Sequence, residues 1–129
     1  TENAPAGDYA EYLVARALRG TLAPNSEKSY DVMAHGVRIP VKSRVVSDPP
    51  KSSQLQLSPF RSFDFDDAVI VLLDNVDYRV RQAVRLPVDD LRAVAAHNQH
   101  VNGHIVHARP ALMASPAGTD ITSLLRAVP

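Results

Sequence analysis

The stretch AVIVLL at residues 68–73 is the longest apolar run in the chain, and it decides the fold. Its length and its β-branched residues predict a strand, and its lack of polar residues predicts that other layers cover both faces. The polar sequence DNVD at residues 74–77 is typical of a turn and marks the end of the strand. We therefore expect a sheet with this strand near its centre.

Further elements are predicted after this strand. Residues 78–86 alternate between apolar and polar side chains, which predicts a second strand. Pro87 suits the start of a helix, which we expect to run to about Asn98. A weak strand at residues 104–108 and a short last helix from about residue 119 complete the C-terminal half.

The N-terminal part begins with a predicted helix over residues 8–19. Asp8 and Glu11 have the spacing of a capping box, apolar residues recur at helical spacing, and Gly20 follows as a stop signal. Residues 29–33 and 37–46 are then expected to form a hairpin, since they flank the turn signal at residues 35–36. The second strand of this hairpin has one apolar face and one basic face.

The composition places the chain among globular proteins with one core. It has 129 residues, of which 45% are hydrophobic, and no apolar run approaches the length of about 18 residues that a membrane helix needs. No cysteine is present, which fits the cytoplasm, where we expect the protein to act. We expect a single α/β (α+β) domain over residues 1–129, with residues 1–6 as a flexible edge, and leave open whether the domain is part of a longer chain.

The acidic and basic residues are equal in number, but the basic residues are mostly arginine. The net charge is zero, and 11 of the 14 basic residues are arginine. A general nucleic-acid binder is usually more basic, although arginine is the better bidentate partner for phosphate. The placement of the charges therefore matters more than their sum.

The hairpin brings acidic and basic residues to one face. With a two-residue turn, Asp31 lies opposite Pro40, and Lys42 lies one diagonal step away on the same side of the sheet. Arg38 and Arg44 share that face. A carboxylate beside a lysine suits phosphodiester cleavage, because the carboxylate holds a hard cation such as Mg²⁺ while the lysine orients water or stabilises developing charge.

Three short motifs resemble a known family. The sequences GDYAE at residues 7–11, SYD at residues 29–31 and VKSR at residues 41–44 resemble the PD-(D/E)XK, or restriction-endonuclease-like, nucleases, and are similar to small bacterial domains of that class. The resemblance covers roughly residues 7–100. It implies an α-β-β-β-α-β core, here in the order α-β-β-β-β-α-β-α, with a central mixed sheet flanked by helices.

The resemblance also implies roles for individual residues. Asp31 matches the first acid of the family motif, Lys42 its lysine, and Glu11 the first-helix glutamate of some members. Asp31 and Glu11 would hold Mg²⁺ or Mn²⁺, with the backbone carbonyl of Val41 as a further ligand. The chain departs from the family at Pro40, where an acid is expected two residues before the lysine.

These roles imply a metal-dependent endonuclease that hydrolyses DNA. Asp31, Glu11 and Lys42 would be catalytic, and phosphate contacts would come from Arg38, Ser43 and Arg44. The alternative is a relative that has lost catalysis and binds nucleic acid or protein, which Pro40 and the neutral charge favour. Homodimerisation, common among nucleases that cut both strands, is left open, and no membrane partner is expected.

Structural roles explain several of the same residues. Glu11 fits the capping box of its own helix, and Asp31 could form a structural ion pair with Lys42 or Arg38. The arginines at positions 79, 81 and 85 are more typical of an exposed strand than of a phosphate-binding stripe. The four histidines between residues 97 and 107 do not have the spacing of a zinc site.

Overall fold

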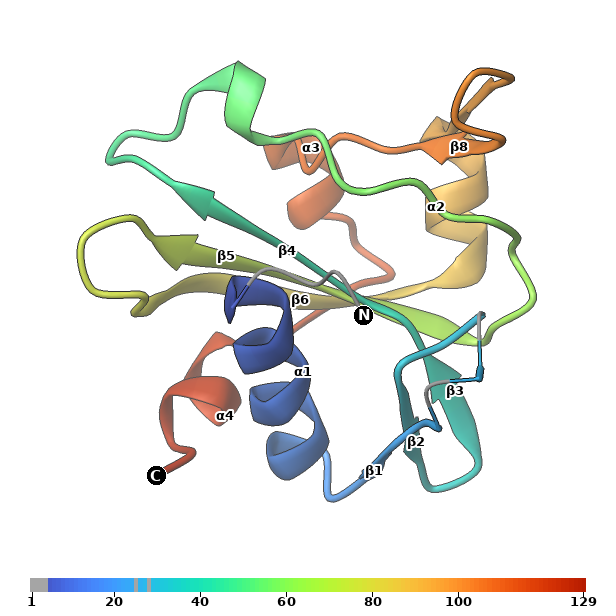
Figure 1. The fold of residues 1–129 in the computed structure, drawn as a ribbon. Coiled ribbons are helices and arrows are strands. Elements are labelled where there is room, and N and C mark those ends of the chain that lie inside the picture. The colour runs from blue at the N-terminus through green and yellow to red at the C-terminus, as the bar shows by residue number, and fades with distance from the viewer. Residues whose placement is uncertain (1–4, 25, 28) are drawn as a thin grey trace.

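The structure, a computed structural model, describes residues 5–24, 26–27 and 29–129 of the chain. Its main sheet has four strands in the order β4-β5-β6-β9. They are β4 (Val41–Val46), β5 (Asp67–Asp74), β6 (Val80–Pro87) and β9 (Thr119–Asp120). The helices are α1 (Pro5–Ala17), α2 (Val88–Val94), α3 (Pro110–Met113) and α4 (Thr122–Arg126). Figure 1 shows α1 and α4 on one face of the sheet and α2 and α3 on the other.

Strand β5 is the centre of the molecule, as its apolar sequence predicted. It pairs in parallel with β4 and antiparallel with β6, and all of residues 68–73 are at most 5% exposed. Alternate residues enter two cores: Val69, Val71 and Leu73 pack on the α1 side, and Ile70 and Leu72 pack on the α2 side. The expected α+β class with a mixed central sheet and flanking helices is therefore confirmed.

A second, smaller sheet holds the predicted hairpin. Its strands are β1 (Thr21–Leu22), β2 (Val32–Ala34) and β3 (Val37–Ile39). Met33 pairs with Arg38, which confirms the predicted register. The turn residues His35 and Gly36 have φ of 53° and 79°, the left-handed conformation that two-residue hairpin turns require.

The expected continuous strand over residues 37–46 is wrong. Pro40 ends β3, and the chain enters the main sheet as β4 (Figure 1). Proline has no N–H for a ladder, so it suits the point where the chain leaves one sheet and joins another. Its carbonyl accepts a hydrogen bond from the N–H of Val69 (3.0 Å), which begins the pairing of β4 with β5.

The first helix begins earlier than predicted. α1 includes Pro5, so Asp8 lies inside its first turn and Glu11 lies about a turn further along. The capping-box interpretation of these two residues is therefore wrong. The expected flexible edge over residues 1–6 is wrong for Pro5 and Ala6, which are helical, with Ala6 buried. The rest of that expected edge lies outside the described residues.

The C-terminal half differs from the prediction in detail. α2 ends at Val94 instead of continuing to Asn98, and a hairpin of β7 (Ala96–Asn98) and β8 (Gly103–Ile105) follows. The short elements α3, β9 and the 3₁₀ helix η1 (Ser52–Gln54) were not predicted. They are brief and carry little periodicity, so tertiary packing decides them. The last helix, α4, was predicted, but it begins at Thr122, because residues 119–120 form β9 instead.

Candidate functional site

A pocket of about 290 Å³ lies at the start of β4. It is bounded on one side by the residues that lead into β2 and on the other by the chain segment at residues 58–62, which we call the cover segment. The lining residues are Ser29, Tyr30, Asp31, Pro40, Lys42, Ser58, Pro59, Phe60, Arg61 and Ser62. The structure therefore brings two of the predicted site residues, Asp31 and Lys42, into one pocket.

Lys42 reaches this pocket from β4 under the cover segment. Its Nζ donates hydrogen bonds to Ser58 Oγ (3.1 Å) and to the carbonyl of Pro59 (3.0 Å). The same nitrogen lies 4.7 Å from the centre of the Phe60 ring. Burial lowers the pKa of Lys42 below its usual value, the charge of Arg61 lowers it further, and nearby acids oppose the change.

Asp31 lies immediately before β2 and is held by the backbone. Its Oδ2 accepts a hydrogen bond from the N–H of Val41 (2.7 Å), and its own N–H donates to the carbonyl of Ile39 (3.0 Å). Burial raises the pKa of Asp31, although the bond from Val41 and the charge of Lys42 both act to lower it. Desolvation is thus the larger influence on both charged groups of the pocket.

These shifts argue against a structural ion pair. In a stabilising pair, the pKa of the carboxylate falls and that of the ammonium rises. Asp31 and Lys42 change in the opposite directions, and the described residues contain no ion pair between them. Arg38, the other candidate partner, binds Asp64 and Asp66 instead. The pocket therefore holds two charges that attract each other without a direct ion pair and whose attraction is smaller than the effect of burial.

Glu11 completes the electrostatic surroundings of the site. It is half-buried in the middle of α1, the helix that packs against β4. Its charge acts to raise the pKa of Lys42, as does the charge of Asp31. Lys42 is therefore under the electrostatic influence of both other residues predicted to be catalytic, although Glu11 does not line the pocket.

The three residues predicted to contact phosphate lie elsewhere. Arg38 binds Asp64 Oδ1 (2.9 Å) and Asp66 Oδ2 (3.3 Å). Arg44 donates to the carbonyl of Gln56, and Ser43 is half-buried on the opposite face of β4 from Lys42. None of the three lines the pocket.

The donor atoms near Asp31 suit a hard cation in part. Among the described residues, only Oδ2 of Asp31 has a hydrogen-bond partner, which leaves Oδ1 for a ligand. N–H and C=O of one residue project to the same edge of a strand, so the Val41 carbonyl lies on the Asp31 side of β4. Pro40 supplies no side-chain ligand, and the described part of the chain contains no group of three acidic or histidine residues placed for a metal. Mg²⁺ commonly uses only one or two carboxylates, with water and substrate phosphate completing its shell.

Sequence reasoning missed the cover segment. Leu55, Leu57 and Phe60 are buried, as apolar residues commonly are, but nothing in the sequence placed their neighbours over Lys42. Ser58 and Arg61 line the pocket only because the cover segment crosses the end of the sheet. The available signal was the small polar and cationic pattern SPFRS at residues 58–62, which is too short to be specific.

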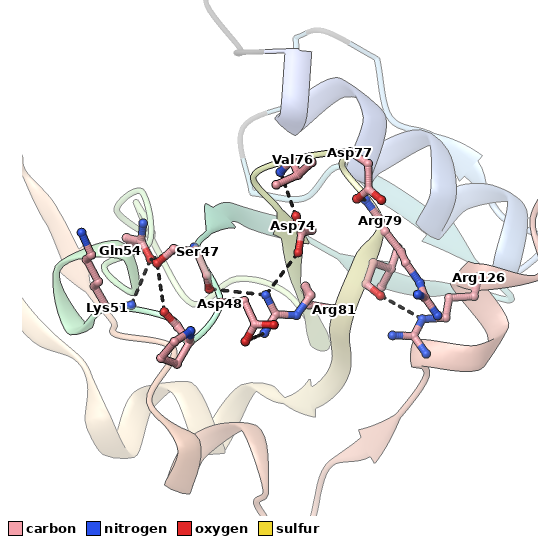
Figure 2. Close-up of polar contacts among 12 residues, drawn as sticks. Ser47, Asp48, Lys51, Gln54, Asp74, Val76, Asp77, Arg79, Arg81 and Arg126 are labelled. Carbon is pink, nitrogen blue, oxygen red and sulfur yellow. Dashed lines mark hydrogen bonds and ion pairs between the residues drawn. The ribbon is translucent and has the colours of Figure 1, made fainter.

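The other charged clusters have structural explanations. Figure 2 shows Arg81 between Asp48 and Asp74, at 3.3 and 3.4 Å, and Arg85 binds Asp67 at 2.7 Å. Both arginines of β6, Arg81 and Arg85, therefore form ion pairs within the domain. His97 and His104 face each other across the β7–β8 hairpin, with ring centres 5.2 Å apart.

The hairpin β7–β8 holds the cover segment in place through a close approach at Gly103. A Cβ atom there would lie 2.8 Å from the Pro59 Cβ and 3.2 Å from the Phe60 carbonyl oxygen. We expect Gly103→Ala to lower the free energy of unfolding by about 1–3 kcal/mol, since backbone must shift to admit the methyl group. Urea unfolding measures this. Gln99→Ala, an exposed change in the same hairpin, is expected to stay within about 0.5 kcal/mol of wild type. An equal effect of the two changes would contradict the close approach.

Comparison with known proteins identifies no family for this chain. A scan against protein-family models gives no match, and a search of curated proteins gives none either. No helix among the described residues is long and apolar enough to cross a bilayer. Any statement about function therefore depends on the pocket of Asp31 and Lys42.

Proposed function

We propose that this domain hydrolyses phosphodiester bonds of DNA in a reaction that requires Mg²⁺ or Mn²⁺, at the pocket of Asp31 and Lys42. One observation carries the proposal: a carboxylate and an ammonium are both desolvated at the same pocket without forming an ion pair. Charges held in this way cost stability, and perturbed groups of this kind gather at functional sites. A cation bound beside Asp31 and a phosphate bound beside Lys42 would compensate both desolvated charges.

Each residue has a defined task in this reaction. The carboxylates of Asp31 and Glu11 and the carbonyl of Val41 would hold the cation, which supplies an activated water and offsets charge in the transition state. Lys42 would donate a hydrogen bond from Nζ to the attacking water or to a phosphate oxygen. The hydrogen bonds to Ser58 and Pro59 fix the position of that nitrogen before substrate arrives.

The order of elements supports a restriction-endonuclease-like core. Helix α1 carries Glu11, the strand β2 follows Asp31, and Lys42 lies on β4 after the turn of the hairpin. The resemblance implies this order of the three residues along the chain, although β2 and β3 both lie between Asp31 and the strand of Lys42 here. The position of Pro40 means that one protein ligand fewer is available, so water or substrate oxygens would take its place.

A second candidate is a domain that keeps the pocket for binding and has lost hydrolysis. Pro40 favours it, because it lines the pocket at the position where the resemblance expects an acid. The lack of a three-ligand group in the described residues points the same way. In this case DNA or another anionic partner would bind without being cut.

The test is cleavage of plasmid and single-stranded DNA with Mg²⁺, with Mn²⁺ and with EDTA. We expect metal-dependent cleavage by the wild type, and its loss in Asp31→Ala and Lys42→Ala. Asp89→Ala, which removes an exposed acid from the first turn of α2, is the matched control and is expected to cut normally. No cleavage by the wild type, together with no metal bound in titration calorimetry, would leave only the binding candidate.

A further inference from the structure

Arg61 is the one cation of the pocket to which the proposed reaction gives no task. Its Nη1 donates to the backbone carbonyls of Val101 and Asn102 in the loop of the β7–β8 hairpin. Both partners are neutral, and the ion pairs of the described residues do not include Arg61. Arg38, Arg81 and Arg85, by contrast, each bind a carboxylate. Arg61 therefore brings a positive charge to the pocket that no acid there offsets directly.

Arg61 lines the same pocket as Lys42. The two cations are close enough for Arg61 to lower the pKa of Lys42. The hydroxyl-bearing residues Ser29, Ser58 and Ser62 line the pocket with them. The Ser29 hydroxyl already donates to Glu27 Oε1 (2.9 Å), whereas Ser58 accepts from Lys42 and keeps its own proton to donate. Two cations and such a hydroxyl around one cavity form a suitable site for phosphate oxygens.

The small number of cationic residues at the pocket limits the class of nucleic acid that it can bind. A protein that binds duplex DNA typically neutralises several phosphates along its surface. Here Arg38 is neutralised by Asp64 and Asp66, just beyond the cover segment, and the chain has no net charge. Only Lys42 and Arg61 line the pocket as cations, and Lys42 is recessed beneath Ser58 and Pro59. A flexible strand can bring a phosphate into such a recess, whereas a stiff duplex needs a wider basic surface.

We propose that the pocket binds one or two successive phosphates of single-stranded nucleic acid, held by Lys42 and Arg61. This names the substrate class of the proposed nuclease and so rests on that function, but the binding itself needs no metal. Arg61 is a phosphate-binding residue in this proposal. The β7–β8 hairpin fixes Arg61 in turn, through the carbonyls of Val101 and Asn102.

The experiment is fluorescence anisotropy with a short labelled oligothymidylate in EDTA, compared with a hairpin duplex of the same length. We expect the single strand to bind more tightly than the duplex. For two phosphate contacts, log Kobs should fall with log[salt] with a slope of about −1.4, since each single-strand contact contributes about −0.7. Arg61→Ala should weaken binding by about tenfold or more and reduce the magnitude of the slope by about 0.7.

Two further variants separate charge from structure. Arg61→Lys keeps a cation at the pocket and is expected to restore the salt slope, which a purely structural role for the guanidinium would not do. Arg109→Ala removes an exposed arginine outside the pocket and is expected to bind like wild type. Circular dichroism of each variant reports whether the domain is folded.

The outcomes distinguish this proposal from the nuclease proposal. Oligothymidylate binding that depends on Arg61, without cleavage in Mg²⁺ or Mn²⁺, would support the site and contradict the nuclease. Metal-dependent cleavage of duplex that is unaffected by Arg61→Ala would support the nuclease and overturn this proposal. Equal affinity for duplex and single strand, or no effect of a folded Arg61→Ala, would overturn it as well.

Discussion

Replacing Lys42 with methionine is expected to reduce metal-dependent cleavage by at least about 100-fold and to leave the domain folded. The loss follows from removal of the only ammonium in the described pocket, since deleting one preorganised donor to a developing charge commonly costs 100- to 1,000-fold. The fold should tolerate the change because methionine occupies similar space beneath Phe60 and carries no charge that needs water.

The stability of this variant is as informative as its activity. Burial lowers the pKa of Lys42, so the charged form is disfavoured by folding at every pH below its folded pKa. Methionine removes that cost, and the two lost hydrogen-bond partners, Ser58 and Pro59, lie at the surface side of the pocket where water can replace the ammonium. We expect the free energy of unfolding at neutral pH to stay within about 1 kcal/mol of wild type.

Urea unfolding and initial cleavage rates measure the two expectations. Lys51→Met is the control, because it removes an exposed lysine outside the pocket and should change neither quantity. A loss of about 3–5 kcal/mol in Lys42→Met would mean that Lys42 compensates Asp31 as a structural partner, contrary to our interpretation. Full activity in a folded Lys42→Met would exclude the lysine from the reaction.

The sequence predicted those parts of the fold that strong local patterns specify. The apolar sequence of residues 68–73 predicted a central strand, and these residues are buried. The two-residue turn at His35 and Gly36 predicted the register of β2 and β3. Register and turn together placed Asp31 and Lys42 on one side. A single short turn was therefore enough to predict which two residues share the pocket.

The rest depended on long-range packing. Pro40 could be recognised as a poor ladder residue, but nothing local indicated that β4 would leave its hairpin and pair in parallel with β5. The sequence predicted a basic face for β4 but gave no sign that Ser58 and Gln56 would bind Lys42 and Arg44 on it. Alternation shows which side of a strand a residue occupies, and it does not show what lies above that side.

Asp31→Asn is expected to abolish cleavage and to make the domain more stable. Asparagine keeps an oxygen that can accept the hydrogen bond from the N–H of Val41, so the start of β4 stays tied to the hairpin. It loses the charge that would hold a cation, for which we expect at least a 100-fold loss of rate. Burial of the ionised carboxylate is unfavourable, which is why the pKa of Asp31 is raised. Asparagine carries no charge and so avoids this loss of stability.

The dependence on pH tests this reasoning. Because the folded pKa of Asp31 lies above its ordinary value of 3.8, its ionised form lowers stability at neutral pH. Below about pH 3.8 the acid is neutral in both the folded and unfolded states, so the cost disappears. The extra stability of Asp31→Asn should therefore be greatest near neutral pH and should shrink as the pH falls.

Asp66→Asn provides a control of opposite sign. Hydrogen bonds from Arg38 lower the pKa of Asp66, so its ionised form stabilises the fold above its unfolded pKa. Its replacement should reduce stability at neutral pH, and the difference should vanish as the pH falls through the folded pKa. Thermal unfolding at a series of pH values measures both variants. If Asp31→Asn instead lost stability at neutral pH, the ionised carboxylate would stabilise the fold. Asp31 would then be a structural acid and not a desolvated charge that a ligand could neutralise.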